Sequence, residues 1–596
     1  MTPRVTPSWG ATWLGGGRAR FRLWAPQASG LRLRTDDGDH AMQPTGDGWF
    51  ETMIDNVAPG ADYAFVLPDG SLVPDPASRA QAGDVHNASR LVDPHSYHWR
   101  HDWQGRDWAE AVIYELHIGT FTPQGTFAAA CDKLTHLAQA GFTAIEIMPV
   151  AQFEGSRGWG YDGVLPYATH NAYGTPDDFK HLIDTAQGLG LMVLLDVVYN
   201  HFGPSGNYLH LYASDFFNPS RETPWGSAIA YEKPPVRSFF IDNAIYWLTE
   251  FRLDGLRLDA IDHIRDTSSP EILIELAESV RATITDRPVH LTTEDNRNVT
   301  HLHERGEDRS VPHYTAEWND DFHNVAHVIA TGESDGYYRD FTQDRWQVLA
   351  LSLAEGFAYQ GQVSPQSGTA RGMPSGHLPP TAFVDFLQNH DQTGNRAFGE
   401  RLIALADPGM LHALSVIHLL SPHIPLLFMG EEYGERRPFC FFTDFTGDLA
   451  DAVREGRRAE FADFAAFAGG ALDHVPDPNA QSTFTASKLD WDHCAGTEGQ
   501  AHLATVKKLL TLRHQHIVPL LSGASGGAGR VISHEDGIIA VDWALHGGTL
   551  QLRANLDDRP RDLPAARGAL LFGTHPGTGK APAYAVAFHL DMEAAQ

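Results

Sequence analysis

GLRLDAIDH (255–263) alternates leucines with polar residues along a short stretch that has the length of a β-strand. Because successive side chains of a strand point to opposite faces, Leu256 and Leu258 are predicted on one face and Arg257 and Asp259 on the other. A guanidinium beside a carboxylate favours the ionised form of that carboxylate. We therefore interpret this stretch as a strand that packs its leucines against helices and presents an ion pair at its end.

Seven further segments along the chain resemble it, and helical segments lie between them, such as residues 126–141 and 175–190. A regular alternation of strand and helix predicts a parallel sheet, and eight such strands predict a (β/α)8 TIM barrel, an α/β fold. The other seven predicted strands are AVIYELHI (111–118), TAIEIMPV (143–150), LMVLLDVVY (191–199), VHLTTED (289–295), YTAEW (314–318), TAFVDFLQNHD (381–391) and PLLFMG (425–430).

The 596 residues are too many for one compact core, and shorter β-like stretches flank the barrel region on both sides. FRLWAP (21–26) and similar stretches predict an antiparallel sandwich before the barrel, and GIIAVDW (537–543) begins a predicted sheet after it. The predicted organisation is a β-sandwich over 1–90, a linker over 91–110, the catalytic barrel over 111–520 with loop insertions at about 201–237 and 431–499, and a small C-terminal β domain over 521–596.

Composition excludes several classes of protein. The chain has 44 Lys and Arg against 75 Asp and Glu, a formal charge of −31, and this argues against nucleic acid or an anionic membrane as a partner. Its three cysteines lie far apart, so they predict neither a disulfide framework nor a zinc ribbon. We find no leader-like N-terminus and no apolar run long enough to span a membrane, so we expect a cytoplasmic enzyme. The sequence carries no signal for the number of subunits.

Polar residues gather where the predicted strands end, and in a barrel those ends open onto one face. Asp259 follows one strand and Glu294 follows the next, which is the arrangement that a retaining glycosidase needs for a nucleophile and a general acid/base. Asp391 and His390 end the seventh strand, and Asp196 ends the strand before Asp259.

Each of these residues has a structural alternative when it is taken singly. A carboxylate after a strand is often a cap or turn residue, and Arg257 and His390 are equally compatible with a structural ion pair and a hydrogen-bonded loop histidine. Their joint occurrence on successive strand ends favours an active site.

These motifs resemble, in order, the four motif regions of the α-amylase superfamily. They are DVVYNH (196–201), GLRLDAIDH (255–263), the glutamate of TTEDN (292–296) and QNHD (388–391). The resemblance implies Asp259 as nucleophile, Glu294 as acid/base and Asp391 as transition-state stabiliser. It implies a substrate-binding or orienting role for Asp196, Asn200, His201, Arg257, His263, His390 and Tyr161 of GWGYDG (158–163), although Tyr161 is also compatible with a loop core.

The flanking segments narrow the resemblance. The sandwich before YELHIGTFT (114–122) is similar to that of branching enzymes, debranching enzymes and maltooligosyltrehalose trehalohydrolases. AEWNDDFHN (316–324), MGEEYGERRPFCFFTDF (429–445) and PDPNAQSTFTASKLDW (476–491) resemble the trehalohydrolase family. This resemblance implies hydrolysis of the α-1,4 bond between a maltooligosaccharide and a terminal trehalose, with maltooligosyltrehalose, an α-glucan oligosaccharide, as the substrate.

Asp262 departs from the superfamily pattern, because many amylases carry a lysine there that meets the leaving-group sugars. We interpret it as a substrate-binding residue of an altered leaving-side pocket, and the alternative is a carboxylate at a helix start. RRPFCFFTDF (436–445) either walls that pocket or belongs to the core. No cofactor and no required metal are predicted, because the loop after Asn200 offers few carboxylate ligands.

Two other functions remain open from the sequence. A glucan-branching transglycosylase shares the sandwich and the barrel, and an inactive barrel that only binds glycans is the alternative from another class. An intact set of three carboxylates argues against the second.

Overall fold

The computed structural model describes residues 8–461, 474–574 and 579–592. Eight parallel strands close into a barrel, as predicted, and they follow each other around it in chain order. They are β10 (Ile113–Leu116), β11 (Ala144–Ile147), β14 (Met192–Val197), β17 (Gly255–Leu258), β18 (His290–Thr293), β19 (Ala316–Trp318), β20 (Phe383–Phe386) and β21 (Ile424–Phe428).

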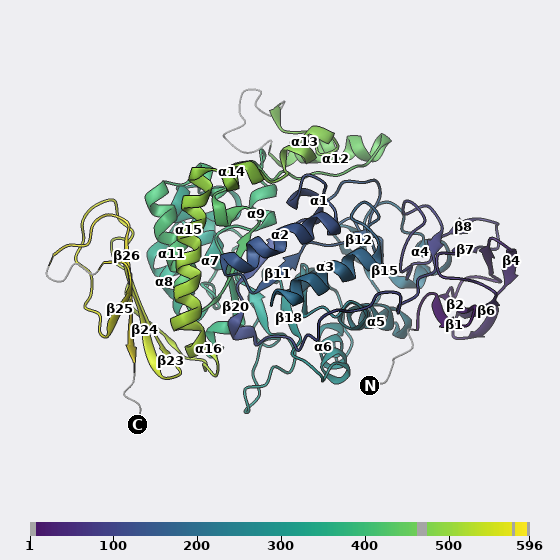
Figure 1. Ribbon diagram of the computed structural model, residues 1–596, viewed down its shortest axis with the longest axis horizontal. Helices are drawn as coiled ribbons and strands as arrows, with labels where there is room; N and C mark the ends of the chain where they lie inside the picture. The colour runs from purple at the N-terminus through teal and green to yellow at the C-terminus, as the bar shows by residue number, and fades with distance from the viewer. Residues whose placement is uncertain (1–7, 462–473, 575–578, 593–596) are drawn as a thin grey trace.

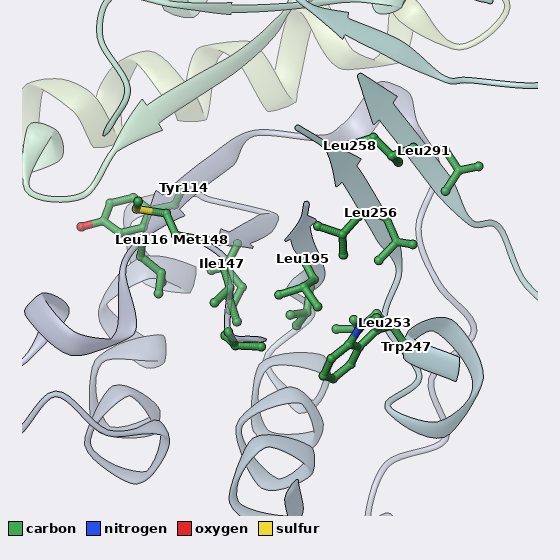
Figure 2. Close-up of a cluster of buried hydrophobic side chains, with 14 of the residues drawn as sticks. Tyr114, Leu116, Ile147, Met148, Leu195, Trp247, Leu253, Leu256, Leu258 and Leu291 are labelled. Carbon is green, nitrogen blue, oxygen red and sulfur yellow. The ribbon is translucent and has the colours of Figure 1, made fainter. Parts of the chain in front are cut away.

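Side chains alternate along the barrel strands as the sequence predicts. Leu256 and Leu258 are fully buried among the apolar side chains between strands and helices, together with Leu195 and Ile147 of the neighbouring strands. Figure 2 shows these leucines and Ile147 in one layer, with Trp247 of a covering helix beside them. The intervening residues of β14 and β17, Asp196 and Arg257, are paired in register and face the barrel interior.

In the described part of the chain, eight long helices cover the barrel, and one step of the expected alternation is wrong. Residues 294–315, all of which the structure describes, connect β18 to β19 without a helix or strand, and Gly306 and Pro312 lie in that connection. The connection from β19 to β20 contains two covering helices instead of one. The covering helices are α2 (Phe127–Ala140), α3 (Pro176–Gly188), α5 (Pro234–Glu250), α6 (Ile272–Thr283), α7 (Asp320–Thr331), α8 (Arg345–Glu355), α11 (Pro408–Leu420) and α15 (Thr497–Leu512).

The predicted loop insertions contain regular structure. The hairpin of β15 (Phe217–Thr223) and β16 (Gly226–Ile229) lies within 201–237. The described part of 431–499 holds α12 (Gly447–Glu460), α13 (Gln481–Ala486) and α14 (Trp491–Ala495), which Figure 1 shows gathered on one side of the barrel. A short pair of strands, β12 (Ala151–Gln152) and β13 (Leu165–Thr169), frames a further loop that the sequence did not predict as an insertion.

The N-terminal module is an antiparallel sandwich, as predicted. One sheet contains β1 (Thr12–Gly15), β2 (Arg18–Trp24), β6 (Trp49–Asp55) and β5 (Gln43–Gly46). The other contains β4 (Gly38–Ala41), β3 (Arg32–Thr35), β7 (Asp62–Val66) and β8 (Leu72–Val73), with β9 (Ser89–Arg90) on β7. Phe21 of the first sheet meets Tyr63 of the second edge to face, 4.8 Å between ring centroids.

The C-terminal module is a five-stranded antiparallel sheet, which confirms the predicted small β domain. Its strands are β22 (Gly529–Ser533), β23 (Ile538–Leu545), β24 (Gly548–Asn555), β26 (Ala585–Met592) and β25 (Ala569–Phe572). Trp543 fixes it to the barrel by donating a hydrogen bond to the Leu353 carbonyl of α8. Figure 1 shows the sandwich and this sheet at opposite ends of the molecule, with the barrel between them. The domain boundaries stay predictions.

Among the described residues, no helix combines the length and apolar character that crossing a membrane requires.

Candidate active site

Arg257 lies at the centre of the polar residues that follow the barrel strands. Its side chain is fully buried and lies over the ring of Trp318, 4.2 Å from the ring centroid. Nη1 contacts Asp196 Oδ2 at 2.6 Å and Asp259 Oδ1 at 2.9 Å, and Nη2 forms an ion pair with Glu294 Oε2 at 2.7 Å. One guanidinium thus brings together three carboxyl groups from three consecutive strands.

Asp259 follows β17 directly. Besides Arg257, it has a second hydrogen-bond donor, Asn200, which lies in the connection after β14. The Nδ2 of Asn200 donates to Asp259 Oδ2 at 2.9 Å and to its main-chain carbonyl at 2.7 Å. This amide joins the connection after β14 to the predicted nucleophile, while the Asn200 Oδ1 meets His201 Nδ1.

Glu294 follows β18 directly and is held by the backbone of the β17 end. The Ala260 amide donates to Glu294 Oε2 at 2.9 Å, and Ala260 adopts a left-handed conformation with φ 40°. Such a conformation is strained for a residue other than glycine and is typical of functional sites. Burial raises the pKa of Glu294, and Asp259 raises it further against the opposing effect of Arg257. This is the direction that a general acid needs.

Asp391 and His390 open a short helix, α9 (His390–Gly394), which begins four residues after the end of β20, so they do not belong to the strand itself. Asn389 caps this helix by accepting from the Asp391 amide at 2.9 Å. Asp391 Oδ2 lies 3.4 Å from His390 Nε2, and Asp391 Oδ1 accepts from Asn395 at 3.0 Å. This cap therefore holds the backbone from which the side chains of His390 and Asp391 project.

Tyr161 joins the two sides of the site. Its hydroxyl donates to Asp196 Oδ2 at 2.6 Å and meets His390 Nε2 at 2.8 Å, and its ring stacks on the His390 ring at 5.1 Å. The preceding Gly160 has φ 105°, and a Cβ there would lie 2.1 Å from the Pro149 carbonyl oxygen, so only glycine fits. Burial raises the pKa of Asp196 to about 7, although Arg257 opposes this.

His201, Asp262 and His263 form the rim of the site. His201 stacks on Trp225 at 4.1 Å between ring centroids, and the edge of His263 meets the same indole at 5.1 Å. Trp225 is 47% exposed at the tip of the β15–β16 hairpin. The Oδ2 of Asp262 lies 4.0 Å from the Nε2 of His263, and burial raises the pKa of the Asp262 carboxyl.

Glu115, Trp225, Trp318 and Asp320 lie near the site and were not assigned from the sequence. Glu115 binds His390, and strand alternation was the available signal, because Tyr114 and Leu116 face the helices. Asp320 accepts from Gln392 at 3.2 Å, and burial and the neighbouring Glu294 raise its pKa to about 8. No local pattern distinguishes Trp225 from a loop aromatic.

The phenylalanines of RRPFCFFTDF belong mostly to the core. Phe439 and Phe442 are fully buried, and Phe439 stacks on Trp159 at 5.3 Å. Phe442 packs edge to face on His117. Of the two interpretations of this segment, packing behind the site is therefore the one observed.

Comparison with known proteins adds the family. The model of the alpha amylase catalytic domain matches residues 92–225, and a domain of unknown function (DUF3459) matches residues 525–588. The malto-oligosyltrehalose trehalohydrolase of Deinococcus radiodurans is 43% identical over 512 residues, which are 85% of this chain and 83% of that protein. The chain belongs to the malto-oligosyltrehalose trehalohydrolase family.

Two further matches differ in how much of the chain they cover. A 1,4-alpha-glucan branching enzyme of Leifsonia xyli is 33% identical over 290 residues, only 42% of this trehalohydrolase-family chain and 38% of that enzyme. A crystal structure of a Salmonella typhimurium protein described as an alpha amylase is 55% identical, covers 99% of this chain and 100% of that one, and superposes with a TM-score of 0.96.

Proposed function

We propose that the chain hydrolyses the α-1,4-glucosidic bond between the maltooligosyl part and the terminal trehalose of maltooligosyltrehalose, and so releases trehalose. Membership of the trehalohydrolase family over most of the chain is the observation that carries this proposal. The three carboxyl groups around Arg257 supply the chemistry that a retaining glycosidase needs.

In the first step, a carboxylate oxygen of Asp259 attacks the anomeric carbon of the maltooligosyl part. The bond from that carbon to the trehalose oxygen breaks, and the proton of Glu294 moves to this oxygen, so trehalose leaves as a neutral alcohol. The raised pKa of Glu294 keeps this proton available at the start of the reaction. Asp391 stabilises the positive charge of the distorted sugar ring, and His390 binds the hydroxyl groups of this ring.

In the second step, water attacks the same anomeric carbon and the ester bond to Asp259 breaks. Glu294, now a carboxylate, accepts a proton from the water and is reset as an acid. Arg257 contacts both Asp259 and Glu294, so it compensates charge as the negative charge moves between them. We place Asp262 and His263 on the leaving side, where trehalose departs.

The test is incubation with maltooligosyltrehalose and chromatographic analysis of the products. We expect free trehalose and a maltooligosaccharide in equal amounts. Maltose without trehalose would assign the chain to another α-glucan hydrolase and overturn the proposal.

The branching reaction is the second candidate, because 290 residues of the chain align with a branching enzyme at 33% identity. Incubation with amylose distinguishes the two, since a branching enzyme adds α-1,6 linkages that NMR detects and a trehalohydrolase adds none. We expect no increase.

A further inference from the structure

We propose that Glu115 is a positioning residue for the reaction, because it fixes both the orientation and the charge of His390. This inference rests on the proposed function. Glu115 lies in β10, three strands around the barrel from β17, and was not recognised as part of the site from the sequence. The side chains of Glu115 and His390 are 2% and 1% exposed, so water does not compete for their contact.

Glu115 binds His390 through both carboxylate oxygens. Oε1 meets the ring at Nδ1, and Oε2 accepts a hydrogen bond from the His390 main-chain amide at 3.1 Å. One contact sets the position of the α9 start and the other sets the rotation of the ring. A bidentate contact of this kind leaves the imidazole with one orientation, which directs Nε2 toward Tyr161 and Asp391.

The hydrogen bonds also determine the protonation of His390. Nδ1 faces a carboxylate and therefore carries a proton. The hydroxyl proton of Tyr161 is donated to Asp196, so toward His390 the hydroxyl offers a lone pair, and Nε2 must donate. With both nitrogens protonated, His390 is an imidazolium whose Nε2–H is directed toward the Tyr161 hydroxyl and Asp391.

The charged groups around His390 agree with this assignment. Burial alone would lower its pKa, but Asp391 and Glu115 outweigh burial and raise the pKa to about 10. The other titratable groups that face it are Arg257, Tyr161, Glu146, Glu294 and His117. Of the two anions that raise the pKa, Glu115 is the buried one.

The neighbouring strand provides a matched control. Glu146 of β11 is paired in register with Glu115 and is equally buried, but both of its carboxylate oxygens lack a hydrogen-bond partner. Burial raises its pKa well above the usual range, and Gln is nearly isosteric with it. Glu146→Gln therefore changes a buried glutamate of the same barrel that makes no hydrogen bond to His390.

The experiment measures kcat and KM of Glu115→Gln and Glu146→Gln against pH. Without Glu115 the His390 pKa returns toward or below its ordinary value near 6.5, so the imidazolium is lost as pH rises. We expect the kcat deficit of Glu115→Gln to grow at least about tenfold between pH 5 and pH 8, with KM little changed. Glu146→Gln keeps the wild-type profile. A deficit that is constant with pH overturns the inference.

A double-mutant cycle with His390→Asn gives an independent reading. If Glu115 acts through His390, adding Glu115→Gln to the His390→Asn variant lowers kcat by less than about threefold. A full additive loss overturns the inference. Should Glu115→Gln fail to fold, Glu115→Asp takes its place in the cycle, with the same criterion, because it keeps the charge but shortens the reach.

The same variants are also assayed on a linear maltooligosaccharide. If the wild-type chain releases no trehalose, the proposed function fails, while the pH dependence on the linear substrate still tests Glu115. Wild-type turnover with a pH-independent deficit in Glu115→Gln overturns the role of Glu115 alone.

Discussion

Asp259 and Glu294 contact the same guanidinium, but the rest of their surroundings differ. Asp259 accepts from the Asn200 amide, whereas Glu294 accepts from the Ala260 main-chain amide and has a raised pKa. Two carboxyl groups with different environments are suited to two different roles. At the residue scale, the proposed roles therefore make separate predictions for each group.

Replacing Asp259 by Asn removes the proposed nucleophile and nearly preserves its shape. We expect kcat on maltooligosyltrehalose to fall at least about a thousandfold, because no ester with the enzyme can form. Binding of the substrate, measured by calorimetry, stays within about threefold of the wild-type value. Turnover above about a tenth of wild type contradicts the assignment of Asp259.

Replacing Glu294 by Gln removes the proton that the leaving trehalose requires. We expect a loss of about 10²–10⁴-fold on maltooligosyltrehalose. A maltooligosyl fluoride, whose leaving group needs no proton, should lose far less in the first step. Equal losses on the two substrates, measured by single-turnover kinetics, would argue against an acid role for Glu294.

The same residue sets the high-pH side of the rate profile. Since the pKa of Glu294 is raised, its proton is retained above the usual range of a glutamate and lost as pH rises through that pKa. We expect wild-type kcat to fall along this limb. When the Glu294→Gln variant forms the ester from the fluoride substrate, its rate should not fall at high pH. A fall that persists in this variant would assign the titration to another group.

At the scale of single elements, β17 requires a glycine where it starts beside β18. A Cβ on Gly255 would lie 2.2 Å from the His290 carbonyl oxygen, which is part of the backbone and has no flexible side chain to move. This close approach sets how near the two strands that carry Arg257 and Glu294 lie to each other.

Gly255→Ala is therefore expected to destabilise the protein by about 1–3 kcal/mol through overpacking and to lower the apparent melting temperature. Gly456→Ala is the control, because a Cβ there meets nothing within 4 Å in α12. We expect that variant to be neutral or slightly more stable. Equal melting temperatures for the two variants would mean that β17 and β18 move apart to accommodate the Cβ with no loss of unfolding free energy.

At the scale of the whole molecule, Trp9 connects the sandwich to the barrel. It is fully buried, its ring lies 4.9 Å from Trp49 of the sandwich and 5.0 Å from Phe239 of α5, and Nε1 donates to the Pro235 carbonyl at 3.0 Å. The contact combines aromatic packing with a satisfied polar group, so it is a specific joint between two modules.

Trp9→Ala removes this joint, and we expect a loss of about 3–5 kcal/mol of unfolding free energy. Limited proteolysis should then cut between the sandwich and the barrel before the barrel itself is degraded. Leu14→Ala, at a site that is 51% exposed on β1, is the control and should change neither property. A Trp9→Ala variant that melts as wild type excludes Trp9 as the joint.

The sequence by itself determined the barrel, both flanking β modules and the three carboxyl groups that contact Arg257. These follow from local regularities: alternation along GLRLDAIDH faces Arg257 away from Leu256 and Leu258, and parallel strands bring their polar ends to one face. The regular alternation of strand and helix was wrong between β18 and β19, because strand count does not constrain that connection.

Only the tertiary structure decided which side chains meet across the barrel. Glu115 and His390 are 275 residues apart, and Trp225 reaches His201 and His263 from the tip of a hairpin. A buried glutamate in a strand has the same local pattern whether it binds a histidine, as Glu115 does, or has no hydrogen-bond partner, as Glu146 does. The difference depends on which elements lie nearby inside the barrel: closure pairs β10 with β21 and so brings Glu115 close to the end of β20, where His390 lies.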